Sequence, residues 1–406
     1  MVPGRPQPRA SAAPGFQGGA SRAAGRASVS YEVRSNPHGE VRLPGDRTDT
    51  LGVPDGRRRE ADVKVLVTGG CGFLGSHVCE LFLGLGWEIV SFDNMTKAEL
   101  LRTGYATDAA RDHNWKLLEE MGAQLLRADV RNLEELLDHS AGCDYIIHTA
   151  AQPAVTIGIE DPLLDLATNV VGSVHVLEAA RRHNVPVASC ASVHVYGNWV
   201  NDQLRENETR YLREPAAIAE DAPTMQGYLT PLHGSKASAE HYVRVYASTW
   251  GLRAASFRLT GIYGPRQLGG EDHGWVANFA IRNLLGWPIT IFGNGKQVRD
   301  ILYAGDVARS FQAFFERGEA GVYNIGGGEA HAISLLEALD VIAEATGRPC
   351  DVRYEPSRFG DLRYFVCDIA RARDTLGWQP EIPPAEGIPR LVEWVRQNRS
   401  LFGCGA

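Results

Sequence analysis

The chain has 406 residues, of which 44% are hydrophobic and 22% charged, enough apolar material for one large core or a core with a smaller lobe. Its seven cysteines are scattered, without Cys-x-x-Cys or metal-ligand spacing, so we expect reduced thiols, no metal site and a cytoplasmic protein. No run approaches the roughly 18 apolar residues of a membrane-spanning helix, and no apolar run follows a basic amino terminus as in a signal peptide.

Charge is distributed unevenly along the chain. Residues 1–60 contain ten Arg and six Asp or Glu, which leaves 31 basic and 43 acidic groups in the rest. A body this acidic repels the backbone of a nucleic acid, which argues against nucleic-acid partners. Any phosphate must instead be held by a few local Arg side chains and backbone N–H groups.

Residues 1–61 are rich in Gly, Ala, Pro, Arg and Ser and show no apolar periodicity. Such a segment cannot bury enough surface to offset the entropy of ordering, so we predict a disordered amino-terminal extension. Its first 31 residues hold four Arg and no acid, which leaves organelle targeting open beside an untidy tail or a start codon assigned too early.

Regular patterning begins at Val63, where short β-branched runs start to alternate with amphipathic segments. We expect strands at 63–67, 89–92, 124–127, 145–148 and 187–189, and helices that include 76–84, 133–139 and 165–183. This alternation predicts an α/β fold with a doubly wound parallel sheet of the Rossmann type over 62–260. The pattern becomes irregular after about 260, which predicts a smaller carboxyl-terminal lobe, 261–400, with segments crossing back to the sheet.

A glycine pattern follows the first expected strand, with glycines at Gly69, Gly72 and Gly75 before a helix. In this context the glycines allow a tight turn, close approach to a pyrophosphate and close packing of helix on strand. Asp93 ends the second strand, 18 residues after Gly75. There its carboxylate would accept a hydrogen bond from a ribose 2′-hydroxyl, which favours NAD over NADP. The other expected NAD contacts are Phe73, Leu74, Asn94, Asp129, Val130, Ala150 and Ala151. For Asp129, an ordinary helix start before Asn132 is an equal alternative.

Further motifs follow in a fixed order: His148–Ala151, Ser192–Gly197, Tyr263–Arg266, Asn294–Asp300, Arg358–Asp361 and Leu376–Pro380. With the glycine motif, they resemble the extended short-chain dehydrogenases/reductases, the NAD-dependent epimerase/dehydratase family, over about 63–400. Within that family, Gln152, Gln267 and the segments 273–276 and 294–300 are most similar to the CDP-paratose 2-epimerase subfamily.

The resemblance implies tightly held NAD, a nucleotide-sugar substrate and a homodimer. It implies substrate contacts at Gln152, Asn278, Arg299 and Arg358, of which the two arginines would clamp phosphates. Three functions remain open: an epimerase that oxidises a ring hydroxyl transiently, a dehydratase or decarboxylase, and an NAD and sugar-nucleotide binding protein with little turnover.

The resemblance also reveals a departure at the catalytic tyrosine. In the family a tyrosinate takes the sugar hydroxyl proton, aided by a Lys four residues later and by a Ser or Thr. Here Ser192 is present, as is Lys236, which the resemblance implies also holds the nicotinamide ribose of NAD, but the tyrosine position is Leu232, which cannot exchange a proton. His233 is the first candidate to replace it, although it could simply cap or pack the helix. Tyr228 and His194 are other candidates. His194 would lie on the same face as Ser192 if the strand that contains Ser192 continued through it.

Overall fold

The structure is a computed structural model that describes residues 34–35, 41–42, 63–96, 100–358 and 360–403. Two units are distinguished, 1–57 and 58–406. In the first, β1 (Arg34–Ser35) pairs antiparallel with β2 (Val41–Arg42). The predicted disorder of the amino-terminal extension stays a prediction, and the rest of this segment lies outside the described residues.

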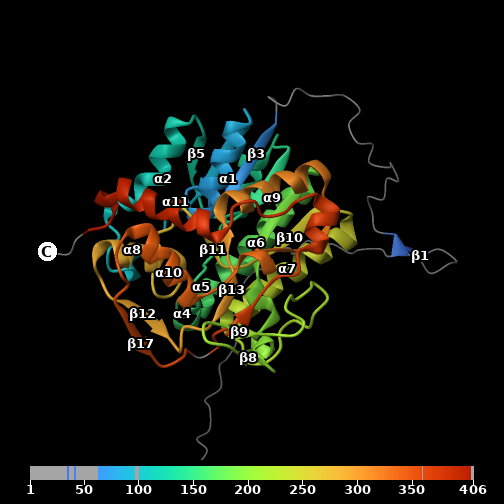
Figure 1. Ribbon diagram of the computed structural model, residues 1–406. Helices are drawn as coiled ribbons and strands as arrows, with labels where there is room; N and C mark the ends of the chain where they lie inside the picture. Colours follow the sequence, from blue (N-terminus) through green and yellow to red (C-terminus); the bar gives the residue numbers. More distant parts are fainter. Residues whose placement is uncertain (1–33, 36–40, 43–62, 97–99, 359, 404–406) are drawn as a thin grey trace, which may run out of the picture. The chain divides into compact units, whose positions relative to one another are not determined.

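Seven of the described strands in the second unit form one parallel sheet, in the order β5-β4-β3-β6-β7-β10-β15 (Figure 1). Their bounds are β3 Lys64–Thr68, β4 Glu88–Asp93, β5 Gln124–Arg127, β6 Tyr145–His148, β7 Val187–Ser192, β10 Ala254–Leu259 and β15 Gly321–Ile325. The strand order reverses direction between β3 and β6, where doubly wound sheets bind their ligands. The predicted fold is confirmed, with β10 and β15 added to the five expected strands.

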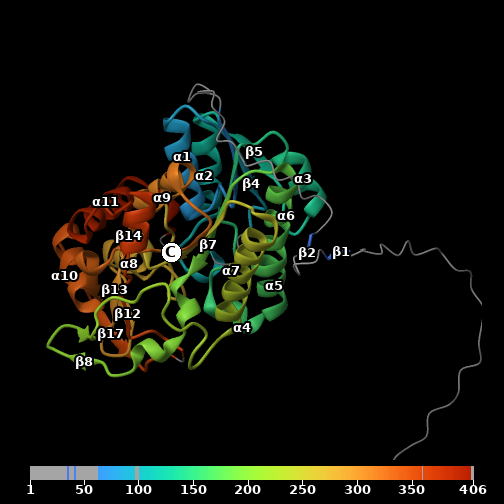
Figure 2. The ribbon, with the colours of Figure 1, turned by 90° about the vertical axis from the view of Figure 1, so that its right-hand side faces the viewer.

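Helices cover both faces of the sheet (Figure 2). One face carries α1 (Phe73–Gly84), α2 (Asp108–Glu120) and α9 (Ala304–Arg317), and the other carries α3 (Leu133–Ser140), α6 (Gly172–His183) and α7 (Pro231–Trp250). Side chains of a strand alternate between faces, so Val65 and Val67 pack with Phe311 while Leu66 packs with Leu177. The sheet therefore has two separate apolar cores.

The helical stretch Pro162–His183 is long and apolar enough to cross a membrane by length and composition. It consists of α5 (Pro162–Leu166), a π-helical turn at Ala167–Val171, and α6. Val176, Leu177 and Ala180 are fully or almost fully buried in the core beneath the sheet, which is the environment of a core helix.

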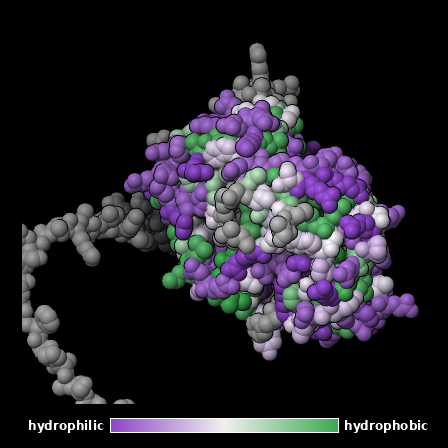
Figure 3. Space-filling view, turned by 90° about the vertical axis from the view of Figure 1, so that its left-hand side faces the viewer, coloured by the Kyte–Doolittle hydropathy of each residue, from purple (hydrophilic) through white to green (hydrophobic). Residues whose placement is uncertain are grey.

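Most of the remaining elements form the lobe that follows residue 260, with α8 (Trp275–Leu285), α10 (Leu335–Thr346) and α11 (Pro384–Gln397) around one apolar cluster. Short strands complete the fold: β11 Ile262–Tyr263 with β14 Leu302–Tyr303, β12 Ile289–Phe292 with β17 Val352–Glu355, β16 Ala332–Ser334 with β13 Val298–Asp300 and β18 Tyr364–Phe365, and β8 Arg205–Glu206 with β9 Tyr211–Leu212. The face in Figure 3 is mainly hydrophilic, with hydrophobic residues in separate patches. Because 58–406 form one compact unit, a domain boundary near 260 stays a prediction.

Candidate cofactor and active site

A tight glycine turn connects β3 to α1. Gly69 has a φ of +71°, and a Cβ there would lie 2.7 Å from the backbone nitrogen of Ala150. Gly75 lies in the first turns of α1, where a Cβ would lie 2.0 Å from the Gly69 carbonyl oxygen. Gly72 precedes the helix, and no side chain caps α1. The first backbone N–H groups of α1 lie at the positive end of the helix dipole, where they suit the binding of a pyrophosphate.

A cleft opens beside this turn, at the carboxyl ends of β3, β4 and β6. Its lining includes Gly69, Gly72, Asp93, Asn94, Val130, Ala150 and Ala151, which are seven of the predicted NAD contacts. Phe73, Leu74, Gly75, Asp129 and the predicted ribose contact Lys236 are not in the lining. Thr149, from the motif His148–Ala151, also lines the cleft, as do Arg131, Ile157, Leu164 and Thr168, which the sequence did not single out. Their position after a parallel strand, at the reversal of strand order, is the signal that could have indicated them.

The Asp93 carboxylate is fixed at the edge of the cleft. Its Oδ2 accepts from the backbone N–H of Cys71 at 3.0 Å and its Oδ1 from that of Met95 at 2.7 Å. The side chain is 8% exposed, at the end of β4. A carboxylate in this position fits the hydroxyls of the adenosine ribose and would repel a 2′-phosphate.

Asp129 lies outside the lining of the cleft and holds a lining residue, Asn94, through a hydrogen bond. Its carboxylate accepts from Arg131 Nη2 at 2.6 Å and from Asn94 Nδ2 at 3.0 Å. The hydrogen bond from Arg131, followed by that from Asn94, holds the pKa of Asp129 well below its usual range. The cap of α3 is Asn132, whose side chain accepts from the Glu135 N–H. Asp129 therefore positions Asn94 and is not the cap of α3, and its contact with NAD stays a prediction.

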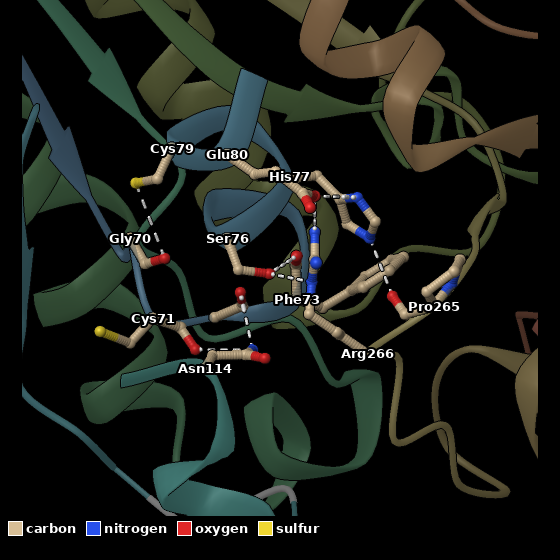
Figure 4. Close-up of polar contacts among 11 residues, drawn as sticks. Gly70, Cys71, Phe73, Ser76, His77, Cys79, Glu80, Asn114, Pro265 and Arg266 are labelled. Atoms are coloured by element: carbon tan, nitrogen blue, oxygen red, sulfur yellow. Dashed lines mark hydrogen bonds and ion pairs between the residues drawn. The ribbon is translucent and has the colours of Figure 1, made fainter. Parts of the chain in front are cut away.

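Figure 4 shows how the first turns of α1 are tied to the segment after β11. Arg266 donates through Nε to Ser76 Oγ at 3.0 Å and through Nη2 to Glu80 Oε2 at 2.6 Å. His77 Nε2 lies 2.8 Å from the Pro265 carbonyl oxygen. Burial, with a smaller effect of Arg266, lowers the pKa of His77 to about 3, so the neutral ring donates this bond. The Gly-Pro-Arg motif thus fixes a lobe segment to the helix predicted to face NAD.

The predicted catalytic residues Ser192 and Lys236 lie close together, at the end of β7 and on α7. Lys236 Nζ donates to the Cys190 carbonyl at 3.3 Å, and burial lowers its pKa. Ser192 Oγ lies 2.9 Å from His194 Nδ1 and accepts from the His194 N–H at 3.2 Å. The strand does not continue through His194, because Ser192 caps a 3₁₀ turn at Val193–Tyr196. This turn, rather than strand alternation, brings the imidazole to the hydroxyl.

His233 caps α7. Its Nδ1 accepts from the Thr230 N–H at 3.1 Å and lies 2.7 Å from Thr230 Oγ1. The residue is 1% exposed, and its Nε2 has no hydrogen-bond partner among the described residues. Its ring meets that of His194 at 88°, with centroids 5.3 Å apart. Leu232 beside it is also buried, so the observed role of His233 is capping and packing.

The two predicted phosphate-binding arginines have different partners. Arg299, in β13, donates to the Val298 carbonyl at 2.8 Å and contacts the Leu362 carbonyl. Arg358 donates to the Glu271 carbonyl at 2.7 Å, and its guanidinium carbon lies 3.6 Å from the centroid of the Phe292 ring. Each guanidinium is positioned by these contacts, and their action as a clamp stays a prediction.

The side chains of Gln152 and Asn278 are used internally. Gln152 lines the NAD cleft, but its Nε2 donates to Asp165 at 2.8 Å and its Oε1 accepts from the Ala154 N–H. Asn278 is 2% exposed in α8 and accepts from Arg282. Both amides are therefore held by neighbouring side-chain or backbone groups, and their contact with a substrate stays a prediction.

The chain matches the family described as "NAD dependent epimerase/dehydratase family" over residues 65–326, more than half its length. It belongs to this family. It is 34% identical to CDP-paratose 2-epimerase of Salmonella typhi over 82% of the chain and 99% of that protein. It is 32% identical to UDP-glucose 4-epimerase of Mycolicibacterium smegmatis over 83% of the chain and 99% of that protein.

The solved structure of Thermus thermophilus UDP-glucose 4-epimerase in complex with NAD is also similar, with a TM-score of 0.68 and 32% identity. The match covers 83% of this chain and 100% of that one. Family membership and the cleft together confirm the predicted NAD cofactor and the predicted enzyme class. The individual site residues stay predictions supported by the geometry described above.

Proposed function

We propose that this chain is a nucleotide-sugar epimerase that oxidises a ring hydroxyl transiently and then returns the hydride to the other face of the carbon. The observation that carries this proposal is the 34% identity to CDP-paratose 2-epimerase over 99% of that protein. A CDP-sugar is therefore the first substrate to test, with C2 as the first candidate for the reacting carbon.

Different residues are assigned to the cofactor, to the sugar and to the diphosphate of the substrate. Bound NAD supplies an acceptor and donor of hydride. Asp93 fits its adenosine ribose, Lys236 its nicotinamide ribose, and Ser192 the sugar hydroxyl. Arg299 and Arg358 would bind the diphosphate, where a planar guanidinium suits bidentate contacts with phosphate oxygens.

A second candidate keeps the oxidation but diverts the keto intermediate to loss of water or CO₂. The buried Leu232 at the tyrosine position supports it, because a changed acid/base set suits a changed outcome. So does 28% identity to UDP-glucuronic acid decarboxylase 1 of Arabidopsis thaliana over 92% of this chain. Leu232 supports the third candidate, a binding protein with little turnover, equally well.

One experiment separates the three. The purified protein is denatured to identify released nucleotide, and fresh protein is incubated with CDP-, UDP- and GDP-sugars in D₂O under NMR and mass detection. We expect bound NAD and an isomer of unchanged composition. Loss of water or CO₂ would select the second candidate, and NAD binding without change of any sugar would contradict the epimerase proposal.

We further propose that the protein is a homodimer that pairs through α5 and α7. These neighbouring helices carry exposed apolar side chains: Leu163 is 75% exposed, Val245 44% and Tyr242 43%. A second copy of the chain would bury them by symmetry, whereas a monomer would leave them in water. The oligomeric state in solution tests this directly.

We also propose that the protein works in the cytoplasm. All six described cysteines are free, as expected for thiols in a reducing compartment. Cell fractionation with an antibody against the chain would place it, and recovery in a membrane or organelle fraction would contradict the proposal.

A further inference from the structure

We infer that His194, acting through the Ser192 hydroxyl, exchanges the proton that the family assigns to the tyrosine replaced here by Leu232. This inference rests on the proposed function, because it assigns a residue to that reaction. It starts from one contact, the 2.9 Å between Ser192 Oγ and His194 Nδ1.

The hydrogen bonds of Ser192 limit the roles open to its hydroxyl, which has one donor and two acceptor positions. One acceptor position is taken by the His194 N–H at 3.2 Å. The inference assigns the hydroxyl proton to Nδ1, which requires the tautomer of His194 with its proton on Nε2 and leaves one acceptor position of Ser192 for a sugar hydroxyl.

The other imidazole cannot take this part in the observed geometry. Nδ1 of His233 already accepts from the Thr230 backbone, and the ring is 1% exposed. His233 instead lies edge to face against His194, at 88°. We therefore treat His233 as a positioning residue that holds the His194 ring.

The surroundings of His194 match a base that starts neutral. Lys236 is bound to the carbonyl of Cys190, two residues before Ser192, so the nicotinamide-ribose site and the Ser192–His194 pair lie at the same strand end. Burial, followed by His233 and Arg299, lowers the pKa of His194 to about 3. The ring is therefore neutral near pH 7, and because the same burial disfavours the imidazolium, the contact with Ser192 and not the basicity of the ring supports the inference.

The step balances with groups already present. With NAD bound as the hydride acceptor, the sugar hydroxyl proton would move to Ser192 Oγ, and the proton of Ser192 would move to His194 Nδ1. The electron pair of the sugar O–H bond forms the second bond of the ketone. Return of hydride reverses both proton transfers and leaves neutral His194.

The test compares His194→Gln with the control His183→Gln, which replaces a partly buried histidine bound to a backbone carbonyl outside the site. We expect His194→Gln to lower kcat by roughly 10² to 10⁴-fold, with KM and NAD content near those of wild type. The acid limb of the kcat profile, where His194 becomes protonated and can no longer accept, should disappear. A kcat within about threefold of wild type would overturn the inference; this is well under the range for loss of a positioned base.

A readout independent of turnover comes from ¹⁵N NMR of imidazole-labelled wild-type protein, assigned with the variant. We expect His194 to carry its proton on Nε2, and Ser192→Ala to shift its Nδ1 signal. A proton on Nδ1 would overturn the inference even if His194→Gln failed to fold. An active wild type with an equally active variant would refute only the role of His194, whereas a wild type that turns over no sugar nucleotide would refute the proposed function and this inference with it.

Discussion

The Asp93 carboxylate occupies the edge of the NAD cleft, where two backbone N–H groups hold it in place. Its fixed charge is the feature of the cleft that distinguishes a ribose hydroxyl from a ribose phosphate. The position of Asp93 at the end of the second strand was sufficient to predict that it lies in the cleft. The end of this strand and the glycine turn lie side by side where the strand order of the parallel sheet reverses.

We expect Asp93→Asn to weaken NAD binding about 10-fold or more, because it removes a charge-assisted hydrogen bond to the ribose. The preference for NAD over NADP should narrow at the same time. Calorimetric titration of nucleotide-free protein measures both affinities. Asp144→Asn is the control, since Asp144 also accepts from a backbone N–H, that of Lys64, ahead of β6. Equal NAD affinities for the two variants would contradict the role of Asp93.

Sequence reasoning reached its limit at His233 and His194. Both lie near the predicted catalytic positions, and a pattern of residue types cannot tell which ring faces a ligand. That choice depends on the capping bonds of Thr230 and on the 3₁₀ turn after Ser192. Both are set by backbone angles that the local sequence does not specify by itself.

At the scale of elements, α1 contains two glycines that differ in the space available for a side chain. A Cβ at Gly75 would lie 2.0 Å from the Gly69 carbonyl oxygen, whereas a Cβ at Gly84 would meet nothing within 4 Å. We expect Gly75→Ala to destabilise the protein by about 1–3 kcal/mol through overpacking. Gly84→Ala should stabilise it by about 0.5–1 kcal/mol through helix propensity. Urea unfolding measures both, and equal signs for the two changes would contradict this packing.

β3, β6 and α6 are joined by a buried histidine. His148 Nδ1 lies 2.7 Å from Thr68 Oγ1 and its Nε2 lies 3.0 Å from Ser173 Oγ. Burial, with a smaller effect of Lys236, lowers its pKa to about 3. Between that value and 6.5 the unfolded chain binds the extra proton, so the contribution of His148 to stability is lost as the pH falls through this window.

We therefore expect His148 alone to remove about 1 kcal/mol from the free energy of unfolding between about pH 7.5 and pH 5.5. Urea unfolding at both pH values measures this change. In His148→Asn the loss over the same interval should be smaller by about that amount. An identical pH dependence in the variant and the wild type would contradict the assignment.

At the scale of the whole molecule, the sequence predicted five strands of the sheet and missed two. β10 and β15 pair in parallel, from Ala255 opposite Gly321 to Leu259 opposite Ile325. The two strands are brought together across a long intervening segment, and tertiary packing of this kind leaves no local periodicity to detect. β15 shows how the chain after residue 260 returns to complete the sheet.

Assembly provides the prediction at this scale. If α5 and α7 pair two copies, then Leu163→Glu with Val245→Glu should yield a monomer, because four carboxylates would face one another across the symmetric contact. Light scattering after size exclusion measures the mass. Met121→Glu, at an exposed residue following α2, is the control and should leave the dimer intact. A wild-type monomer would contradict the proposed pairing.

The contacts of Arg266 and His77 with their partners have a mechanical consequence. Separating the segment after β11 from α1 would break three polar contacts and leave a guanidinium that is now 8% exposed without its partners. These contacts join the segment after β11 and the first turns of α1 into one rigid piece, so NAD bound at α1 would keep a fixed distance from this part of the lobe.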